Sequence, residues 1–226
     1  TRLWLDLGAA FGRYGELRIG PHYERLSISP LVAPLDANTV RTIDSGFHAG
    51  LVIDQRDAAA FARSGYRIEA NLQRSLPAFG ATAGYTRVQW ASEYARSIGD
   101  NTFDFALKYG TVFSRESVVF PYFELGGLLQ MSGLRPGELR GDRVAFARIT
   151  GFRRIGTMPA FGRGIYVGGS LETGRIESPS NPLLPAVTLY GGSVFIGLDT
   201  SLGPLYVGYG QASGNRRNAY LFLGRP

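Results

Sequence analysis

Apolar and polar residues alternate along many short segments of this chain, and this period of two limits the fold more than any other feature of the sequence. In the clearest segment, 102–113, Phe103 and Phe105 fall on one face, while Asp104 and Lys108 fall on the other. Successive side chains of a β-strand point to opposite faces of a sheet, so each such segment predicts a strand with one apolar face. The sequence therefore predicts an all-β protein.

Eleven segments with this pattern lie along the chain, and no linker or change in composition separates them, so we expect one domain over residues 1–226. The predicted strands lie at 1–11, 15–29, 45–56, 65–75, 83–96, 102–113, 143–154, 163–174, 187–199, 204–212 and 218–224. Short turns such as 97–101 alternate with longer loops, of which 114–142 is the longest. This order predicts about eleven or twelve antiparallel strands in an up-and-down arrangement.

Two classes of β protein fit this pattern, a transmembrane β-barrel and a soluble β-sheet binding module. The solvent face of a soluble sandwich should carry Lys and Glu, whereas here the less apolar face carries Gly, Ala, Ser and Tyr with few charges. Such a face suits a crowded, partly hydrated lumen. Aromatic residues near strand ends, such as Tyr66 and Phe113, fit the aromatic girdles of a barrel. The sequence thus favours a barrel in the bacterial outer membrane, with the soluble module as the alternative.

Composition excludes several kinds of functional site. The chain has no cysteine, which excludes disulfide scaffolds and cysteine nucleophiles. Its two histidines, His22 and His48, cannot form a three-histidine site, and no carboxylate cluster is expected near both, so we expect no metal and no cofactor. No Gly-x-Ser-x-Gly elbow, phosphate-binding loop or dinucleotide fingerprint is present, so we expect no catalytic residues. The basic residues are scattered, which disfavours nucleic-acid binding.

The longest loop carries the sequence that resembles a known family. Residues 122–142 read YFELGGLLQMSGLRPGELRGD, which resembles the sixth extracellular loop of the bacterial surface antigen superfamily, the barrels of outer-membrane assembly factors and two-partner secretion. In that superfamily a Gly-Gly pair precedes a Val-Arg-Gly-Tyr/Phe tip, and the loop folds back into the lumen. Here Ser132 stands at the position of the family's arginine. The loop residues singled out by the resemblance are Gly126, Gly127, Ser132, Gly133, Leu134, Arg135, Pro136, Gly137, Glu138, Arg140 and Asp142.

Two other segments support the same resemblance. Residues 54–57, Asp-Gln-Arg-Asp, resemble the family's periplasmic turn, and residues 170–174 resemble its aromatic-x-Asp-x-Gly strand motif, with Glu172 in place of Asp. In the family that acid meets the loop arginine inside the lumen. The resemblance therefore implies that Arg135 or Arg140 pairs with Glu172 and gates the lumen, and the alternative is that Arg135 is a solvated loop residue.

Within the superfamily, the loop sequence SGLRPGEL and the segments 203–210 and 220–225 resemble the barrel of patatin-like phospholipase autotransporters, type V secretion subtype d. This resemblance implies that the chain holds the last eleven strands of a sixteen-strand barrel, with five strands and a lipase domain before Thr1. It implies that the barrel anchors and exports or displays this fused lipase and is not itself an enzyme. The alternative is a stand-alone barrel of the same superfamily that handles polypeptides or lipids.

Partners follow from the predicted location. A barrel of this family would contact outer-membrane lipids, the barrel assembly machinery and its fused passenger, and a homodimer is left open. Lys108 is the only lysine among 24 basic residues, and arginine binds phosphate in a bidentate fork. Arg216 and Arg217 in the tip 213–218 are therefore candidate contacts to lipopolysaccharide, and the alternative is that they are ordinary solvated arginines.

Overall fold

The structure is a computed structural model, which describes residues 1–28, 40–114, 122–157, 162–179 and 185–224. Twelve of its fourteen strands form one antiparallel sheet in which strands adjacent in sequence pair. They are β1 (Arg2–Trp4), β2 (Leu7–Ala10), β3 (Gly15–Ile28), β4 (Val40–Asp54), β5 (Ser64–Ser75), β6 (Tyr85–Ile98), β7 (Asn101–Ser114), β10 (Arg143–Gly156), β11 (Gly162–Glu177), β12 (Val187–Thr200), β13 (Gly203–Ala212) and β14 (Arg216–Leu223). The predicted all-β, antiparallel, up-and-down fold is confirmed.

The eleven predicted strands all occur, with differences at a few boundaries. The first is split into β1 and β2, which both pair with β3. The break faces Gly20 and Pro21, and Pro21 has no N–H to donate to the ladder. Strand β4 begins five residues earlier than predicted, because its ladder with β3 continues as far as the pair Ile28 and Val40.

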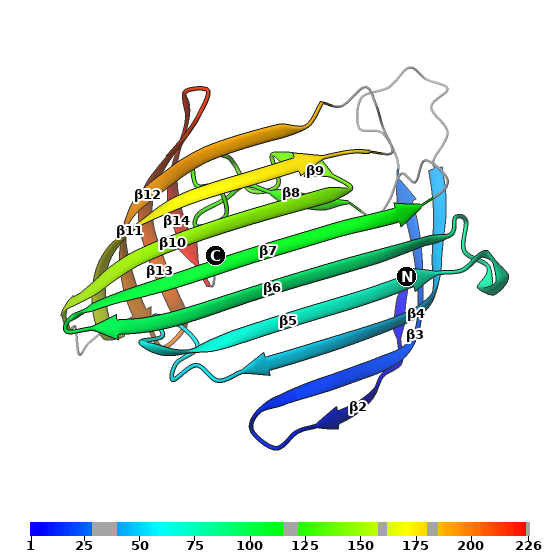
Figure 1. The fold of residues 1–226 in the computed structure, drawn as a ribbon, viewed down its shortest axis with the longest axis horizontal. Coiled ribbons are helices and arrows are strands. Elements are labelled where there is room, and N and C mark those ends of the chain that lie inside the picture. Colours follow the sequence, from blue (N-terminus) through cyan, green and yellow to red (C-terminus); the bar gives the residue numbers. More distant parts are fainter. Residues whose placement is uncertain (29–39, 115–121, 158–161, 180–184, 225–226) are drawn as a thin grey trace.

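The sheet curls strongly around a hollow, which we call the lumen. In Figure 1, β5, β6, β7 and β10 cross the front, while β3 and β4 turn back on one side and β12 to β14 on the other. The sheet begins with β1 and β2 and ends with β14, and these two edges do not pair within the described residues. Short turns join β6 to β7 and β12 to β13 at one end of the strands, and the described part of the long loop lies at the other end. Two connections depart from the predicted alternation, because the nine-residue turn 55–63 lies at the end with the short turns and the three-residue tip 213–215 at the end with the long loop.

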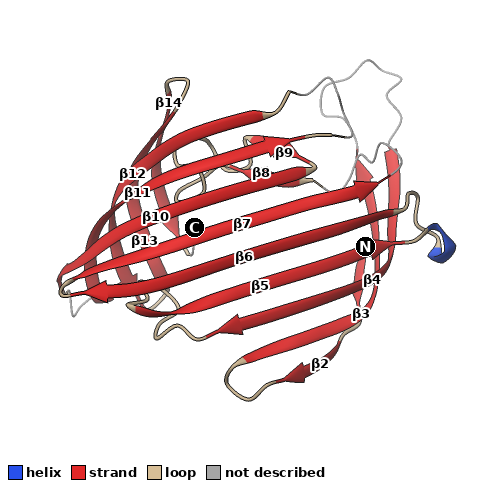
Figure 2. Cartoon of the chain, in the orientation of Figure 1, coloured by secondary structure: helices blue, strands red, loops and turns tan. Residues whose placement is uncertain are grey.

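The outer face of the curled sheet is apolar and bears no second layer among the described residues (Figure 2). Large apolar side chains from strand after strand point outward, and several are extensively exposed, including Leu171 at 73%, Val194 at 64% and Leu221 at 78%. Phe103 and Phe105 lie on this face and Asp104 faces inward, which confirms the predicted alternation in β7. Exposed apolar area of this extent matches a surface covered by lipid rather than by water.

The long loop folds back onto the inner face of the sheet. Its short strands β8 (Phe123–Leu125) and β9 (Leu139–Gly141) pair with each other and form a two-stranded sheet that the sequence pattern did not predict. We call the buried cluster beneath it the loop core. Its members are Phe123, Leu125, Met131, Leu134, Val144, Phe146, Ile176, Leu189 and Ala212. The inward course of the loop is therefore observed for its described part, while 115–121 lie outside the described residues.

Helix is almost absent from the described part of the chain. It is limited to the 3-10 turn η1 (Pro77–Phe79), which lies between β5 and β6 (Figure 2). Within the described residues, no helix has the length and apolar character needed to cross a bilayer.

Candidate functional site

The tip of the long loop is bound to the wall of the lumen through Ser132 and Glu172. The backbone N–H of Ser132 donates to Glu172 Oε2 and its hydroxyl donates to Oε1, both at 2.6 Å. The hydroxyl of Ser170 donates to the same Oε1 at 2.5 Å and lies 2.8 Å from the hydroxyl of Ser193. All four side chains are buried, so the carboxylate is surrounded by hydroxyl and amide donors. Hydrogen bonds to a charged acceptor are the stronger kind, and this set holds the tip in one place.

The predicted ion pair between Glu172 and Arg135 or Arg140 is corrected by this geometry. Arg135 is exposed, and its backbone N–H donates to Glu138 Oε2 at 2.9 Å. Arg140 lies 3.1 Å from Glu124, and both side chains are about half exposed. Both arginines follow the tip and lie outside the buried part of the loop, whereas Ser132 is at its centre. The acid expected in the lumen is therefore present, and its partner is the residue at the family's arginine position.

Glycine allows the tip to come close to the wall. A Cβ on Gly210 of β13 would lie 2.0 Å from the carbonyl oxygen of Ser132, and a Cβ on Gly133 would lie 2.2 Å from the backbone nitrogen of Ala212. Tyr220 of β14 donates its hydroxyl to the Ser132 carbonyl at 2.7 Å. The side chain of a serine is short, so the backbone of the tip must approach the sheet closely before Ser132 can reach Glu172.

The backbone of the tip is also unusual in its dihedral angles. Gly126 and Gly127 have φ of 134° and 115°, which only glycine adopts readily. Leu129 and Met131 have φ of 58° and 82°, in a region that costs free energy for a residue with a Cβ. Met131 is fully buried in the loop core, and burial of its side chain offsets this local cost. The docked loop is thus a conformation that depends on contact with the sheet.

The remaining loop and tip residues have peripheral positions. Gly137 has φ of 66°, the positive value that a glycine following a proline supplies in a type II turn. The carbonyl of Asp142 accepts from the N–H of Val112 at 2.8 Å, where the loop rejoins the sheet. Arg216 lies 3.8 Å from Glu138. Arg217 is exposed and donates to the side-chain oxygen of Asn215 at 2.8 Å. Of the two arginines proposed to contact lipopolysaccharide, only Arg217 is exposed.

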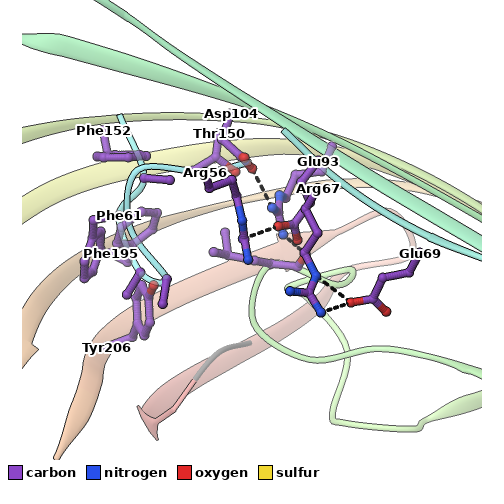
Figure 3. A pocket seen from close by; sticks show the side chains of 15 residues that line it. Arg56, Phe61, Arg67, Glu69, Glu93, Asp104, Thr150, Phe152, Phe195 and Tyr206 are labelled. Atoms are coloured by element: carbon purple, nitrogen blue, oxygen red, sulfur yellow. Dashed lines mark hydrogen bonds and ion pairs between the residues drawn. The ribbon is translucent and has the colours of Figure 1, made fainter. Parts of the chain in front are cut away.

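A second inward segment enters from the opposite end of the lumen. The turn 55–63 between β4 and β5, which contains the Asp-Gln-Arg-Asp motif, lines a cavity of about 310 Å³. Figure 3 shows charged side chains on one side of this cavity and aromatic ones on the other. Arg56 binds both oxygens of Asp54, at 3.0 and 2.8 Å, and Glu93 at 2.7 Å. These bonds, led by those to Asp54, raise the pKa of Arg56 and tie the turn to β4 and β6.

Phe61 attaches the same turn to the far wall. Its ring stacks on Tyr166 with centroids 4.1 Å apart and planes 6° apart, and it also contacts Phe152 and Tyr206. Glycine makes room here as well, since a Cβ on Gly197 would lie 2.4 Å from the ring. We call this cluster the turn core. Its members are Phe61, Leu128, Leu129, Phe152, Tyr166, Phe195 and Tyr206.

The two inward segments meet inside the lumen. Leu128 and Leu129 belong to the long loop, yet they pack in the turn core with Phe61. Arg148 of β10 donates to the carbonyl of Leu129 at 2.9 Å and to Asp104 of β7 at 2.6 Å. A displacement of either segment would therefore expose apolar surface on the other, which couples the two.

The two histidines lie together on the inner face near the first strands. His22 Nε2 is 3.2 Å from Asp44, His48 Nε2 bonds to Asp6, and the ring of Trp4 contacts both imidazoles. Each histidine thus has one carboxylate partner, Asp44 or Asp6, which lies far from it in the sequence and is brought beside it by the folding of the sheet. Across the described ranges, no group of three or more His, Asp or Glu side chains is arranged to hold a metal ion.

Comparison with known proteins identifies the fold. No protein-family model matches the chain, and no curated protein sequence matches it. The crystal structure of BamA from Haemophilus ducreyi lacking POTRA domains 1–3 matches with a TM-score of 0.75 at 11% sequence identity, over 96% of this chain and 52% of that one. The sheet has the outer-membrane β-barrel fold. This barrel sheet spans about half the length of the protein that it matches, and at this identity the likeness concerns the fold.

Sequence reasoning identified Glu172 and the loop but missed three residues that hold the two inward segments against the sheet, namely Ser132, Phe61 and Arg148. In the sequence, Ser132 stood out only as a departure from the family's arginine. That the hydroxyl and N–H of Ser132 could themselves donate hydrogen bonds at the tip was overlooked. Phe61 stood in an alanine-rich segment with no strand pattern. For Arg148, the sequence offered only the alternation of its strand, which places the side chain on the inner face but does not indicate its partners. The motif at 54–57 was the one sequence signal that pointed to the turn.

Proposed function

We propose that this chain belongs to a barrel of the bacterial outer membrane that anchors a fused patatin-like lipase and exports or displays it, with a lumen closed at rest. The observation that carries the proposal is the docking of Ser132 on Glu172. It brings together the two segments, 122–142 and 170–174, whose sequences resemble the surface antigen superfamily. The apolar outer face supports the membrane location.

The contacts inside the lumen support a gated pore. The long loop and the turn 55–63 enter the interior from opposite ends and share the turn core. A passenger that crossed this lumen would have to displace both segments, and it would break the Ser132 contacts and the Phe61 stack. Export must therefore occur before the two segments dock or while they are displaced. Once the segments are docked, the barrel serves as an anchor.

The second candidate is a stand-alone barrel that handles polypeptides or lipids. The same closed lumen supports it, because a resting barrel of either kind must avoid leakage. The two candidates differ in what the complete gene encodes before this barrel. The first requires a patatin domain with a Gly-x-Ser-x-Gly elbow, and the second requires periplasmic polypeptide-transport-associated domains without a lipase.

The test is to read the complete gene and to follow its product in cells. We expect an upstream lipase elbow, a heat-modifiable protein in the outer-membrane fraction, and a lipase domain that external protease removes from intact cells. Replacement of the elbow serine by alanine should abolish lipase activity and leave heat-modifiable migration unchanged. A complete gene without a lipase domain would exclude the first candidate, and a protein that stays monodisperse without detergent would exclude both.

A further inference from the structure

A second cavity, of about 520 Å³, is lined by residues of the long loop and of the strands beneath it. Arg87 of β6 and Lys108 of β7 line it together with the amides Gln89 and Gln130. Both basic side chains are partly buried on the inner face of the barrel. The cavity therefore combines two cations with two amide groups that can donate hydrogen bonds.

Among the described residues, neither cation forms an ion pair or a hydrogen bond, although the carboxylate of Glu124 is near enough to Lys108 to interact with its charge. The guanidinium of Arg87 lies over the ring of Phe123, 4.4 Å from its centroid, and its Nε is buried without a partner. Lys108 is the only lysine of the chain and occupies the middle of β7. Two uncompensated cations in one partly desolvated cavity are unfavourable unless a negative charge joins them.

The contrast with the other cavity is informative. There, Arg56, Arg67 and Arg148 each bind a carboxylate at 2.8 Å or less. Among the described residues that line the second cavity, Glu124 is the one acid, and it is paired with Arg140 at 3.1 Å. Among the described residues, the arginines of the first cavity are thus each paired with a carboxylate, whereas Arg87 and Lys108 are not.

We propose that this second cavity binds a phosphate-type oxyanion between Arg87 and Lys108. The planar guanidinium offers paired donors that match two oxygens of such an anion, and the ammonium adds a flexible point charge. Gln89 and Gln130 complete the donor set. Because the cavity opens on the inner face, the ligand is a free anion from the aqueous lumen, not the headgroup of a lipid whose chains would lie against the outer face.

The position of the site connects the anion to the loop. Phe123 is the first residue of β8, and it packs so closely on Gly110 of β7 that a Cβ there would lie 2.4 Å from its ring. Gln130 belongs to the loop, whereas Arg87 and Lys108 belong to the wall. A bound anion would therefore bridge the loop and the wall and favour the docked loop. This inference requires only the folded barrel and holds for either candidate function.

The test is a calorimetric titration of the full-length protein, purified in a non-ionic detergent, with sodium phosphate in a low-chloride buffer. We expect saturable binding to the wild type, and at least tenfold weaker binding to Lys108→Gln and Arg87→Gln. Lys108→Arg should retain binding, because it keeps the charge. Arg153→Gln is the matched control, since it removes one charge from an exposed arginine paired with Asp100. Heat-modifiable migration in gels verifies that each variant is folded.

Three results would overturn the proposal. The first is an absence of phosphate binding by the folded wild type. The second is equal binding by the wild type, Lys108→Gln and Arg87→Gln. The third comes from a parallel titration with phosphatidylglycerol vesicles. If the protein binds these vesicles only when Lys108 is present and does not bind free phosphate, the two cations bind a lipid headgroup instead.

Discussion

Ser132 and Glu172 are joined by two hydrogen bonds of 2.6 Å, one from the backbone N–H and one from the hydroxyl of the serine. Ser132 is 0% exposed and Glu172 is 5% exposed, so the contact is sealed from water. A long arginine side chain can bridge a gap between loop and wall, but a serine cannot. This barrel therefore closes the gap by bringing the backbone of the tip against β11 and β13.

Replacement of Glu172 by alanine should release the tip of the loop. The change leaves the N–H and hydroxyl of Ser132 buried without an acceptor, and each unsatisfied group costs about 1–3 kcal/mol. We expect a lower melting temperature and a higher single-channel conductance in planar bilayers. Glu177→Ala is the control, because Glu177 lies on the same strand and pairs with the partly exposed Arg143. Conductance and heat stability equal to those of the wild type would contradict the role of this contact.

Replacement of Gly197 by alanine should expel Phe61 from its stack. The new Cβ would lie 2.4 Å from the ring, and overpacking of this kind costs about 1–3 kcal/mol. We expect trypsin to cleave faster after Arg56 or Arg63 in the released turn. Gly151→Ala is the matched change, since its Cβ would lie 3.6 Å from Phe103. Equal cleavage rates for both variants and the wild type would show that the turn does not depend on this stack.

Replacement of Arg56 by lysine should weaken the turn although the charge is kept. Arg56 uses three nitrogens to bind Asp54 and Glu93, and an ammonium cannot reproduce this planar fork. We expect a loss of about 1–3 kcal/mol in the free energy of unfolding by urea in detergent. Arg153→Lys, at an exposed pair, should change it by less than about 0.5 kcal/mol. A loss no larger for Arg56→Lys than for Arg153→Lys would argue against a structural role of the fork.

Replacement of Leu171 by arginine tests the membrane-facing surface. Leu171 points outward near the middle of β11, where an arginine in contact with lipid costs about 2–4 kcal/mol. Leu202 lies in the short turn between β12 and β13, where the same change should cost about 0–1 kcal/mol. Folding yield in lipid vesicles should therefore fall for Leu171→Arg and stay near the wild type for Leu202→Arg. Normal folding of Leu171→Arg would mean that this face is not in lipid.

The strands could be predicted because alternation is a local property. In β7, Phe103 and Asp104 point to opposite faces because they are successive residues of one strand. The structure places Phe103 outside and Asp104 inside, as the alternation predicts. The boundaries were less certain. β4 begins at Val40 because its partner β3 extends as far as Ile28. The residues around position 40 carry no signal for the length of this partner strand.

The candidate site could be predicted only in part. The resemblance located Glu172 and the loop, but it implied an arginine partner by analogy. The actual partner depends on how close Gly133 and Gly210 allow two backbones to come. The pairs of His22 with Asp44 and His48 with Asp6 were missed for a similar reason, since each joins residues from different strands.

The alternation of side chains and the lengths of the connections were sufficient to specify an antiparallel up-and-down sheet with an apolar outer face. Those properties arise from interactions between residues close in sequence. The docking of the long loop and of the turn 55–63 inside the lumen arises from other contacts, such as Ser132 with Glu172 and Phe61 with Tyr166, which join residues far apart along the chain. Only the curvature of the sheet brings these residues together, and so only the tertiary structure could assign their partners.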